Sequence, residues 1–235
     1  MDQSPQHEPT LSDDHIARVR RWHDEAYRES SARPDLTTDH LGRTFHIPAG
    51  IHPITRVSHL LGQAVLDEVR PTDRVLDMGT GCGVNAVLAA ATAREVLAVD
   101  INPAAITATE ANAARNGVTL TARHSDVFST VDGRFDLIVF DPPFRWFAPR
   151  DTLEMASTDH HYRAMNSFFA HVGAHMTDTA RLLIFFGTSG DLDHLHTRAA
   201  AAGLTTETLA TAHHTRDNWT ADYFTYRMTR HPAIE

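Results

Sequence analysis

Short runs of apolar residues alternate along this chain with segments in which apolar residues recur every three or four positions. The short runs predict buried β-strands, and they lie at 75–78, 96–99, 118–124, 135–140 and 180–186. The alanine-rich segments 84–93 and 103–116 between the first three runs predict helices. Strands that alternate with helices are typical of an α/β fold with a mostly parallel sheet.

Two further strand-like runs near the C-terminus, 204–212 and 223–228, have no helical segment between them. A direct connection of this kind favours an antiparallel hairpin, because parallel strands need a long crossover. With the five earlier runs, the pattern predicts a sheet of about seven strands that ends in an antiparallel C-terminal hairpin.

The N-terminal region has a helical pattern of its own. Ser12 is well placed as a helix N-cap, since its hydroxyl can accept a hydrogen bond from a free backbone N–H. The apolar residues after it recur at helical spacing, at Ile16, Val19, Trp22, Ala26 and Tyr27. We expect a helical extension over residues 1–42, followed by one domain over residues 43–235. The extension either packs on the domain or, with the loop 30–39, forms a lid over a substrate site.

A glycine-rich turn, Gly79-Thr80-Gly81-Cys82-Gly83, joins the strand 75–78 to the helix 84–93. Glycine has no Cβ, so the backbone can turn sharply and approach a ligand closely, while the start of the helix presents free N–H groups. A glycine turn alone is also compatible with a purely structural role. Further residues are therefore needed to indicate a ligand.

Acidic residues follow the next two strands. Asp100 ends the strand 96–99, about twenty residues after the turn, where a carboxylate can accept hydrogen bonds from two ribose hydroxyls. Asp126 follows the strand 118–124, in a position where a side chain can meet an adenine amine. The combination predicts a nucleoside-containing ligand.

The strand 135–140 runs into Asp141-Pro142-Pro143-Phe144. Together with Val75 to Gly83 and the two acidic residues above, this motif resembles the class I S-adenosylmethionine-dependent methyltransferases, in particular the amino-methyltransferases with an Asn/Asp-Pro-Pro-Tyr/Phe signature. The release-factor glutamine methyltransferase group is the most similar, since it has a segment like 110–117 and an upstream loop like 50–58. The resemblance extends over about residues 43–144. It implies a Rossmann-like methyltransferase fold with S-adenosyl-L-methionine as cofactor.

The resemblance also implies the site residues. The Asp141 carboxylate and the Pro142 carbonyl would each accept one N–H hydrogen bond from the nitrogen that is methylated, and Phe144 would stack on a flat substrate group. These three are the predicted catalytic residues. The predicted cofactor-binding residues are Thr55, Asp77, Gly79, Thr80, Gly81, Gly83, Asp100, Ile101, Asp126, Val127 and Asp141. The predicted substrate-binding residues are Tyr27, Pro143, Phe144, Trp146, Glu154, Asp159 and His160.

Composition limits the chemistry and the partners. The net charge is −9, and all 21 cationic Lys and Arg side chains are arginine. Without lysine the chain cannot form a Schiff base, and an acidic average argues against a broad nucleic-acid footprint. The single cysteine, Cys82, suits a reducing compartment. No apolar run reaches the ~20 residues of a membrane span, so we expect a cytoplasmic protein without a membrane partner.

The 17 histidines do not have the spacing of a zinc site, and we expect no metal. Glutamine-directed members of the resembling group usually have Asn where this chain has Asp141, and a full negative charge favours an amine-like or cationic acceptor. We therefore expect N-methylation of a small amino-acid-like or guanidino substrate, with arginine as a candidate, and we do not expect nucleic acid as a partner. Two alternative substrates are a glutamine side chain of a protein and the exocyclic amine of adenine in RNA or DNA. A further alternative is that the chain binds the cofactor without catalysing a reaction.

Overall fold

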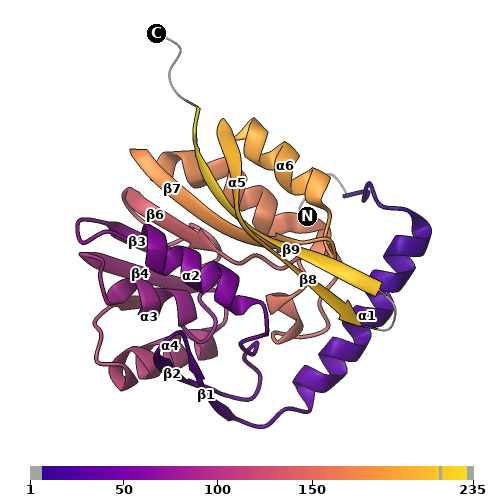
Figure 1. Ribbon diagram of the computed structural model, residues 1–235, viewed down its shortest axis with the longest axis horizontal. Coiled ribbons are helices and arrows are strands. Elements are labelled where there is room, and N and C mark those ends of the chain that lie inside the picture. The colour runs from indigo at the N-terminus through magenta and orange to yellow at the C-terminus, as the bar shows by residue number, and fades with distance from the viewer. Residues whose placement is uncertain (1–6, 217–218, 232–235) are drawn as a thin grey trace.

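The computed structural model describes residues 7–216 and 219–231 of the 235-residue chain, so the first six residues of the predicted extension lie outside the described part. A seven-stranded sheet with the order β5-β4-β3-β6-β7-β9-β8 forms the centre of the molecule (Figure 1). Its first five strands in this order are parallel, whereas β9 pairs antiparallel with β7 and with β8. The predicted α/β fold with an antiparallel C-terminal hairpin is confirmed. The strands of this sheet are β3 (Arg74–Met78), β4 (Glu95–Asp100), β5 (Thr121–His124), β6 (Phe135–Phe140), β7 (Met176–Gly187), β8 (Leu204–Arg216) and β9 (Trp219–Arg230).

Successive residues of each strand point to opposite sides of the sheet, so apolar strands present apolar side chains on both faces. Helices cover both faces. On one face, Ile138 and Ile184 belong to a buried cluster with Phe168 of α5 (Arg163–His175) and Leu195 of α6 (Leu192–Ala201). On the other face, residues of the same strands pack against α2 (Ser58–Glu68) and α3 (Val84–Ala90). α4 (Pro103–Arg115) packs beside β4 and β5. Burial on both faces explains why these strands are almost continuously apolar.

The segment predicted as a loop before residue 40 contains a strand. β1 (Leu36–His40) and β2 (Arg43–Ile47) form a separate two-stranded antiparallel sheet. Two asparagines of α4 bind its backbone: Asn112 accepts from the His46 N–H and donates to the His46 carbonyl, both at 2.8 Å, and Asn116 does the same with Thr44 at 3.1 and 2.9 Å. The strand β1 was missed because its side chains are mostly exposed and give no buried-strand pattern, and it is held by pairing with β2, which α4 anchors.

The helix α1 (Asp13–Ser31) runs along one side of the molecule, next to the end of the β8–β9 hairpin (Figure 1). The Ser12 hydroxyl accepts a hydrogen bond from the His15 N–H, as predicted for an N-cap. Val19 is fully buried in the main cluster, and the Trp22 ring lies edge to face with Trp219 of β9 at 5.5 Å. Within the described residues, no helix combines the length and apolar character needed to cross a membrane.

Candidate functional site

A cavity of about 640 Å³ lies at the carboxyl ends of β3, β4 and β6. Since β4 and β6 flank β3 on opposite sides, the cavity occupies the point where the direction of chain connection reverses, which is where open α/β sheets bind ligands. Gly79, Asp100, Asp126 and Asp141 all line it, from four different loops. Residues of α1 and of the C-terminal hairpin complete its wall.

The glycine turn is held against the neighbouring strand and opens toward the cavity. The Gly79 and Thr80 N–H groups both donate to the Val99 carbonyl, at 2.8 and 3.0 Å. Gly79 and Gly81 have φ angles of +71° and +58°, and a Cβ added at either would meet no atom within 4 Å. The backbone can therefore be approached closely by a ligand, as predicted for a cofactor cradle.

Asp77 lies beneath this turn and is buried. Its carboxylate accepts hydrogen bonds from the Thr80 hydroxyl at 2.6 Å and the Ala86 N–H at 3.1 Å, which ties the turn to α3. Burial raises the pKa of Asp77 to about 6 despite these hydrogen bonds. Gly83 also faces away from the cavity, since a Cβ there would lie 2.9 Å from Thr109 of α4. The structure thus places these two predicted cofactor residues in the support of the turn.

Asp100, which is predicted to bind a ribose, lines the cavity. Its two oxygens accept hydrogen bonds from the Gly81 N–H at 2.9 Å and the Asn102 N–H at 2.8 Å, which leaves lone pairs for two further donors. Ile101 lines the cavity next to it. These residues and the open glycine cradle fit S-adenosyl-L-methionine.

Asp126 and Val127 line the same end of the cavity. The Asp126 carboxylate is already paired with Arg163 at the start of α5, with two N–O distances of 3.0 Å. An adenine amine would therefore share this carboxylate with a guanidinium. Thr55 also lines the cavity, and its N–H donates to Ser58 Oγ at 2.9 Å. The N-cap of α2 is Val57.

The Asp141 to Phe144 segment follows β6, and all four of its residues line the cavity. Asp141 faces the cavity, and no hydrogen bond from a described residue holds its carboxylate. The low polarity of its surroundings, and secondarily the charge of Asp77, raise the pKa of Asp141 to about 7. The Phe144 carbonyl accepts a 2.6 Å hydrogen bond from the Tyr162 hydroxyl. The Phe144 ring packs on Phe186, with ring centroids 4.9 Å apart.

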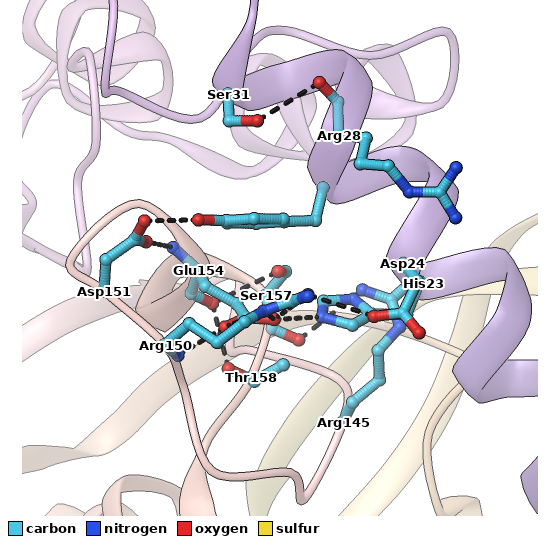
Figure 2. Close-up of polar contacts among 11 residues, drawn as sticks. His23, Asp24, Arg28, Ser31, Arg145, Arg150, Asp151, Glu154, Ser157 and Thr158 are labelled. Atoms are coloured by element: carbon cyan, nitrogen blue, oxygen red, sulfur yellow. Dashed lines mark hydrogen bonds and ion pairs between the residues drawn. The ribbon is translucent and has the colours of Figure 1, made fainter.

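Five of the predicted substrate residues line the cavity: Tyr27, Pro143, Phe144, Glu154 and Asp159. The polar side chains of Tyr27, Glu154 and Asp159 already have partners. The Tyr27 hydroxyl donates to Asp151 at 2.5 Å. Glu154 binds Arg150 and His23, the latter at 2.7 Å (Figure 2). Burial alone would raise the pKa of Glu154, but the hydrogen bonds from these two residues lower it to about 2. Asp159 accepts the Ala164 and Met165 N–H groups at 3.0 Å each and so caps α5.

Trp146 and His160, also predicted to bind substrate, do not line the cavity. Trp146 is only 6% exposed and packs on Phe147, with ring centroids 5.0 Å apart. The His160 ring contacts His161 at 4.1 Å. Burial of an indole ring in the core stabilises the fold more than a position at the rim of the cavity would. The local sequence does not show whether the core has room for it.

The structure brings other residues to the cavity that the sequence did not single out as site residues. His23 comes from α1, His52 from the loop before α2, and Tyr223 from β9. Arg145, directly after the Asp-Pro-Pro-Phe motif, also lines it. Arg145 and His52 carried a sequence signal, because Arg145 adjoins the motif and His52 belongs to the loop 50–58 of the resemblance. His23 and Tyr223 are brought in by long-range packing.

This fold, with a ligand cavity over the ends of its central strands, is that of a class I S-adenosyl-L-methionine-dependent methyltransferase. Comparison with known families makes the assignment specific. The model of the methyltransferase small domain family matches residues 52–186, and the chain belongs to that family.

Individual relatives match over part of their length. The ribosomal protein L11 methyltransferase of Thermotoga neapolitana is 36% identical over 112 residues, which cover 47% of this chain and 41% of the relative. A putative protein N5-glutamine methyltransferase of Methanocaldococcus jannaschii is 39% identical over 71 residues, or 30% of this chain and 36% of the relative. These matches span well under half of either relative. The solved T. thermophilus 16S rRNA N2 G1207 methyltransferase, in complex with AdoMet and guanosine, has a TM-score of 0.63 at 22% identity, covering 84% of this chain and 50% of that one.

These comparisons correct the expected partner. The prediction of a small-molecule substrate, with nucleic acid unlikely, is wrong, because the relatives are named for macromolecular substrates, a ribosomal protein and rRNA among them. That prediction depended on charge matching at Asp141. One carboxylate in a cavity binds an amine equally well whether the amine is free or belongs to a macromolecule. The net charge of −9 describes the average surface and does not describe the cavity.

Proposed function

We propose that this chain is an N-methyltransferase that modifies an exocyclic amine of a base in RNA. The observation that carries the proposal is the Asp141 to Phe144 segment, whose two hydrogen-bond acceptors and aromatic ring line one cavity with the cofactor cradle. An enzyme that modifies a base must hold it outside the helical stack, between hydrogen-bond partners and an apolar or aromatic surface. Phe144 offers that surface, and its ring is held by contacts with the rings of Phe186 and Tyr223, at 4.9 and 6.2 Å.

Bound S-adenosyl-L-methionine supplies a sulfonium methyl group that is already activated. The chain's own residues then have to position the acceptor nitrogen. Its lone pair is delocalised into the base, so it is a weak nucleophile. The Asp141 carboxylate and the Pro142 carbonyl each accept one of its N–H hydrogens, which fixes its orientation and stabilises the positive charge that develops on it. Asp141 can also take up the proton that this nitrogen must lose, because its raised pKa is near neutrality.

A second candidate is a nitrogen of a protein side chain. It is favoured by the names of the two sequence relatives, which are methyltransferases of a ribosomal protein and of glutamine in proteins. The same two acceptors would bind the N–H groups of an amide or amine. The two candidates differ in the group that lies on Phe144, a base in the first and an aliphatic chain in the second.

We also propose that α1, in the N-terminal extension, covers the mouth of this site. Trp22, His23 and Tyr27 of α1 line the cavity. His23 binds Glu154 in the 150–154 segment (Figure 2), and the Tyr27 hydroxyl donates to Asp151 of the same segment. A macromolecular substrate requires this contact to open or to form part of the binding surface.

Transfer of a labelled methyl group tests the proposal. The purified chain is incubated with methyl-labelled S-adenosyl-L-methionine and bacterial ribosomal subunits or tRNA, and RNA and protein are then separated. Label in RNA, located on a base amine by nucleoside mass spectrometry and absent with Asp141→Ala, is expected. Label in protein alone would establish the second candidate. Label in neither fraction, from a preparation that binds S-adenosylhomocysteine, would refute both.

A further inference from the structure

Two arginine side chains are buried among the described residues, and they differ in their partners. Arg181 has Asp73 at 2.5 Å and Glu68 at 3.5 Å. Arg145, which is 7% exposed, has no carboxylate within ion-pair distance in the described part of the chain, and its Nε has no hydrogen-bond partner. A buried charge without a counterion is strongly unfavourable unless a ligand supplies one.

The groups around the Arg145 guanidinium do not neutralise it. It makes long hydrogen bonds to the Ser157 carbonyl at 3.5 Å and the Ser189 hydroxyl at 3.4 Å. The Trp22 ring of α1 lies 4.9 Å from its central carbon. Burial lowers the pKa of Arg145 to about 10, which still leaves it charged at neutral pH. The wall of the cavity therefore holds an uncompensated positive charge.

Neighbouring residues respond to this charge. Burial, and then repulsion from Arg145, lower the pKa of His52 to about 4. The same two causes lower the pKa of His23, which lies close to Arg145 in Figure 2. Both imidazoles therefore stay neutral at pH 7 and can donate a hydrogen bond without adding charge. Two carboxylates of the segment that follows Arg145 and lines the cavity, Glu154 and Asp159, are bound by other groups.

The backbone of Arg145 is fixed beside the methyl-acceptor site. Its N–H donates to the Ser157 carbonyl at 3.3 Å, and its carbonyl accepts from the Asp159 N–H at 2.7 Å. Arg145 directly follows Phe144, so the two Cα atoms are about 3.8 Å apart. Both residues line the same cavity, and Tyr223, whose ring centroid lies 6.2 Å from that of Phe144, also acts electrostatically on the guanidinium. A substrate group on the Phe144 ring therefore lies in the cavity that Arg145 lines.

We infer that Arg145 forms an anion-binding subsite that receives the phosphate of the nucleotide whose base lies on Phe144. The inference deepens the proposed function and depends on it. A nucleotide carries its phosphate at a nearly fixed distance from its base, so every RNA substrate brings an anion to this position. A protein substrate would need an acidic residue at one particular spacing from the methylated one. The planar guanidinium fork matches phosphate oxygens.

The charge of the whole chain makes this subsite more important for binding. With a net charge of −9, the surface provides little general attraction for RNA. Several exposed arginines are paired with acids, such as Arg74 with Glu95 and Arg227 with Glu207. Recognition would then depend on a few local phosphate contacts, and the dependence of affinity on salt would be shallow.

Calorimetry with small probes tests the subsite directly. In the presence of S-adenosylhomocysteine, each of the four ribonucleosides and its 5′- and 3′-monophosphates are titrated into the protein. For at least one base, a monophosphate is expected to bind on the order of tenfold or more tightly than its nucleoside, the usual gain for charge-assisted hydrogen bonds. Arg145→Gln should abolish this difference and leave the affinity for S-adenosylhomocysteine within about threefold of wild type. Arg134→Gln, which alters an exposed arginine away from the cavity, should keep the difference.

Three results would overturn the inference. The first is wild-type protein that binds nucleosides and monophosphates equally, a comparison that needs no variant to fold. The second is an equal loss of S-adenosylhomocysteine affinity in Arg145→Gln, which would assign the guanidinium to the cofactor's carboxylate. The third is displacement of the monophosphates by short acidic peptides at lower concentration, which would assign it to a protein substrate. Failure of the proposed function would give a different result: RNA would receive no labelled methyl group, while the protein would still bind a monophosphate more tightly than its nucleoside.

Discussion

The division of labour between Asp100 and Asp141 is the most direct test of the site. Asp100→Ala removes the two acceptors that face the ribose and also frees the Gly81 and Asn102 N–H groups that its carboxylate binds. A hydrogen bond to a charged group contributes about 1.5–3 kcal/mol. Loss of two such bonds should weaken S-adenosylhomocysteine binding by about a hundredfold or more.

Asp141→Ala should have the opposite profile. The described residues donate no hydrogen bond to this carboxylate, so its removal leaves the cofactor cradle intact. We expect the affinity for S-adenosylhomocysteine to change by less than about threefold, while methyl transfer to RNA falls about a hundredfold, the usual cost of removing one preorganised group that stabilises developing charge.

Isothermal calorimetry measures the affinities, and incorporation of labelled methyl into RNA measures the transfer. Asp178→Ala, which alters a carboxylate that is 95% exposed, is the matched control and should change neither. Equal losses of cofactor affinity in Asp100→Ala and Asp141→Ala would refute the assignment of the two carboxylates to different tasks.

Four further variants test the electrostatics and packing around the site. Because the pKa of Asp141 is raised to about 7, its carboxylate forms as pH rises through neutrality. Initial rates of methyl transfer should therefore increase from pH 6 to 8, and Asp141→Asn should remove this pH dependence. The pKa of Glu154 is lowered from 4.5 to about 2, so its ionised form stabilises the fold above pH 4.5, and that stability is lost as pH falls toward 2. Glu154→Gln should lower the free energy of unfolding in urea at pH 7 by about 2 kcal/mol. This value is smaller than the full pKa shift would give, because Arg150 is half-exposed and solvent screens its interaction with Glu154. Equal stability of the two proteins would contradict this. Gly83→Ala should cost about 2 kcal/mol or more of stability, because its Cβ would lie 2.9 Å from Thr109, whereas Gly79→Ala, with open space at Cβ, should mainly weaken cofactor binding.

Much of the fold and of the cofactor half of the site could be predicted from sequence, because both depend on short stretches. The run from Val75 to Gly83 specifies a buried strand, a turn that needs positive φ angles and a helix start. Asp100 then lies at the end of the next strand, and parallel strands bring such ends together at one edge of the sheet. The antiparallel C-terminal hairpin followed from the absence of a helix between its strands.

The substrate half was predicted less well, because its groups are defined by partners far along the chain. Glu154 has the sequence character of a substrate contact, yet His23, 131 residues away, and Arg150 occupy its carboxylate. Trp146 looked like an aromatic rim residue, yet the core has room for its indole. The nature of the partner was also mispredicted, since one charge in a cavity does not specify what carries the acceptor nitrogen.

The sequence alone determined the order of strands and helices, the glycine turn, and the acids and prolines at the strand ends, since spacing and residue type act over a few positions. Only the tertiary structure decided which of these charges are neutralised. Arg145 illustrates the difference. Its position in the sequence places it beside Phe144. How α1, the 150–159 segment and β9 pack around it decides that, in the part of the chain described, no carboxylate lies near its guanidinium. Coulomb interactions depend on distance in space and on burial, and neither can be read from position along the chain.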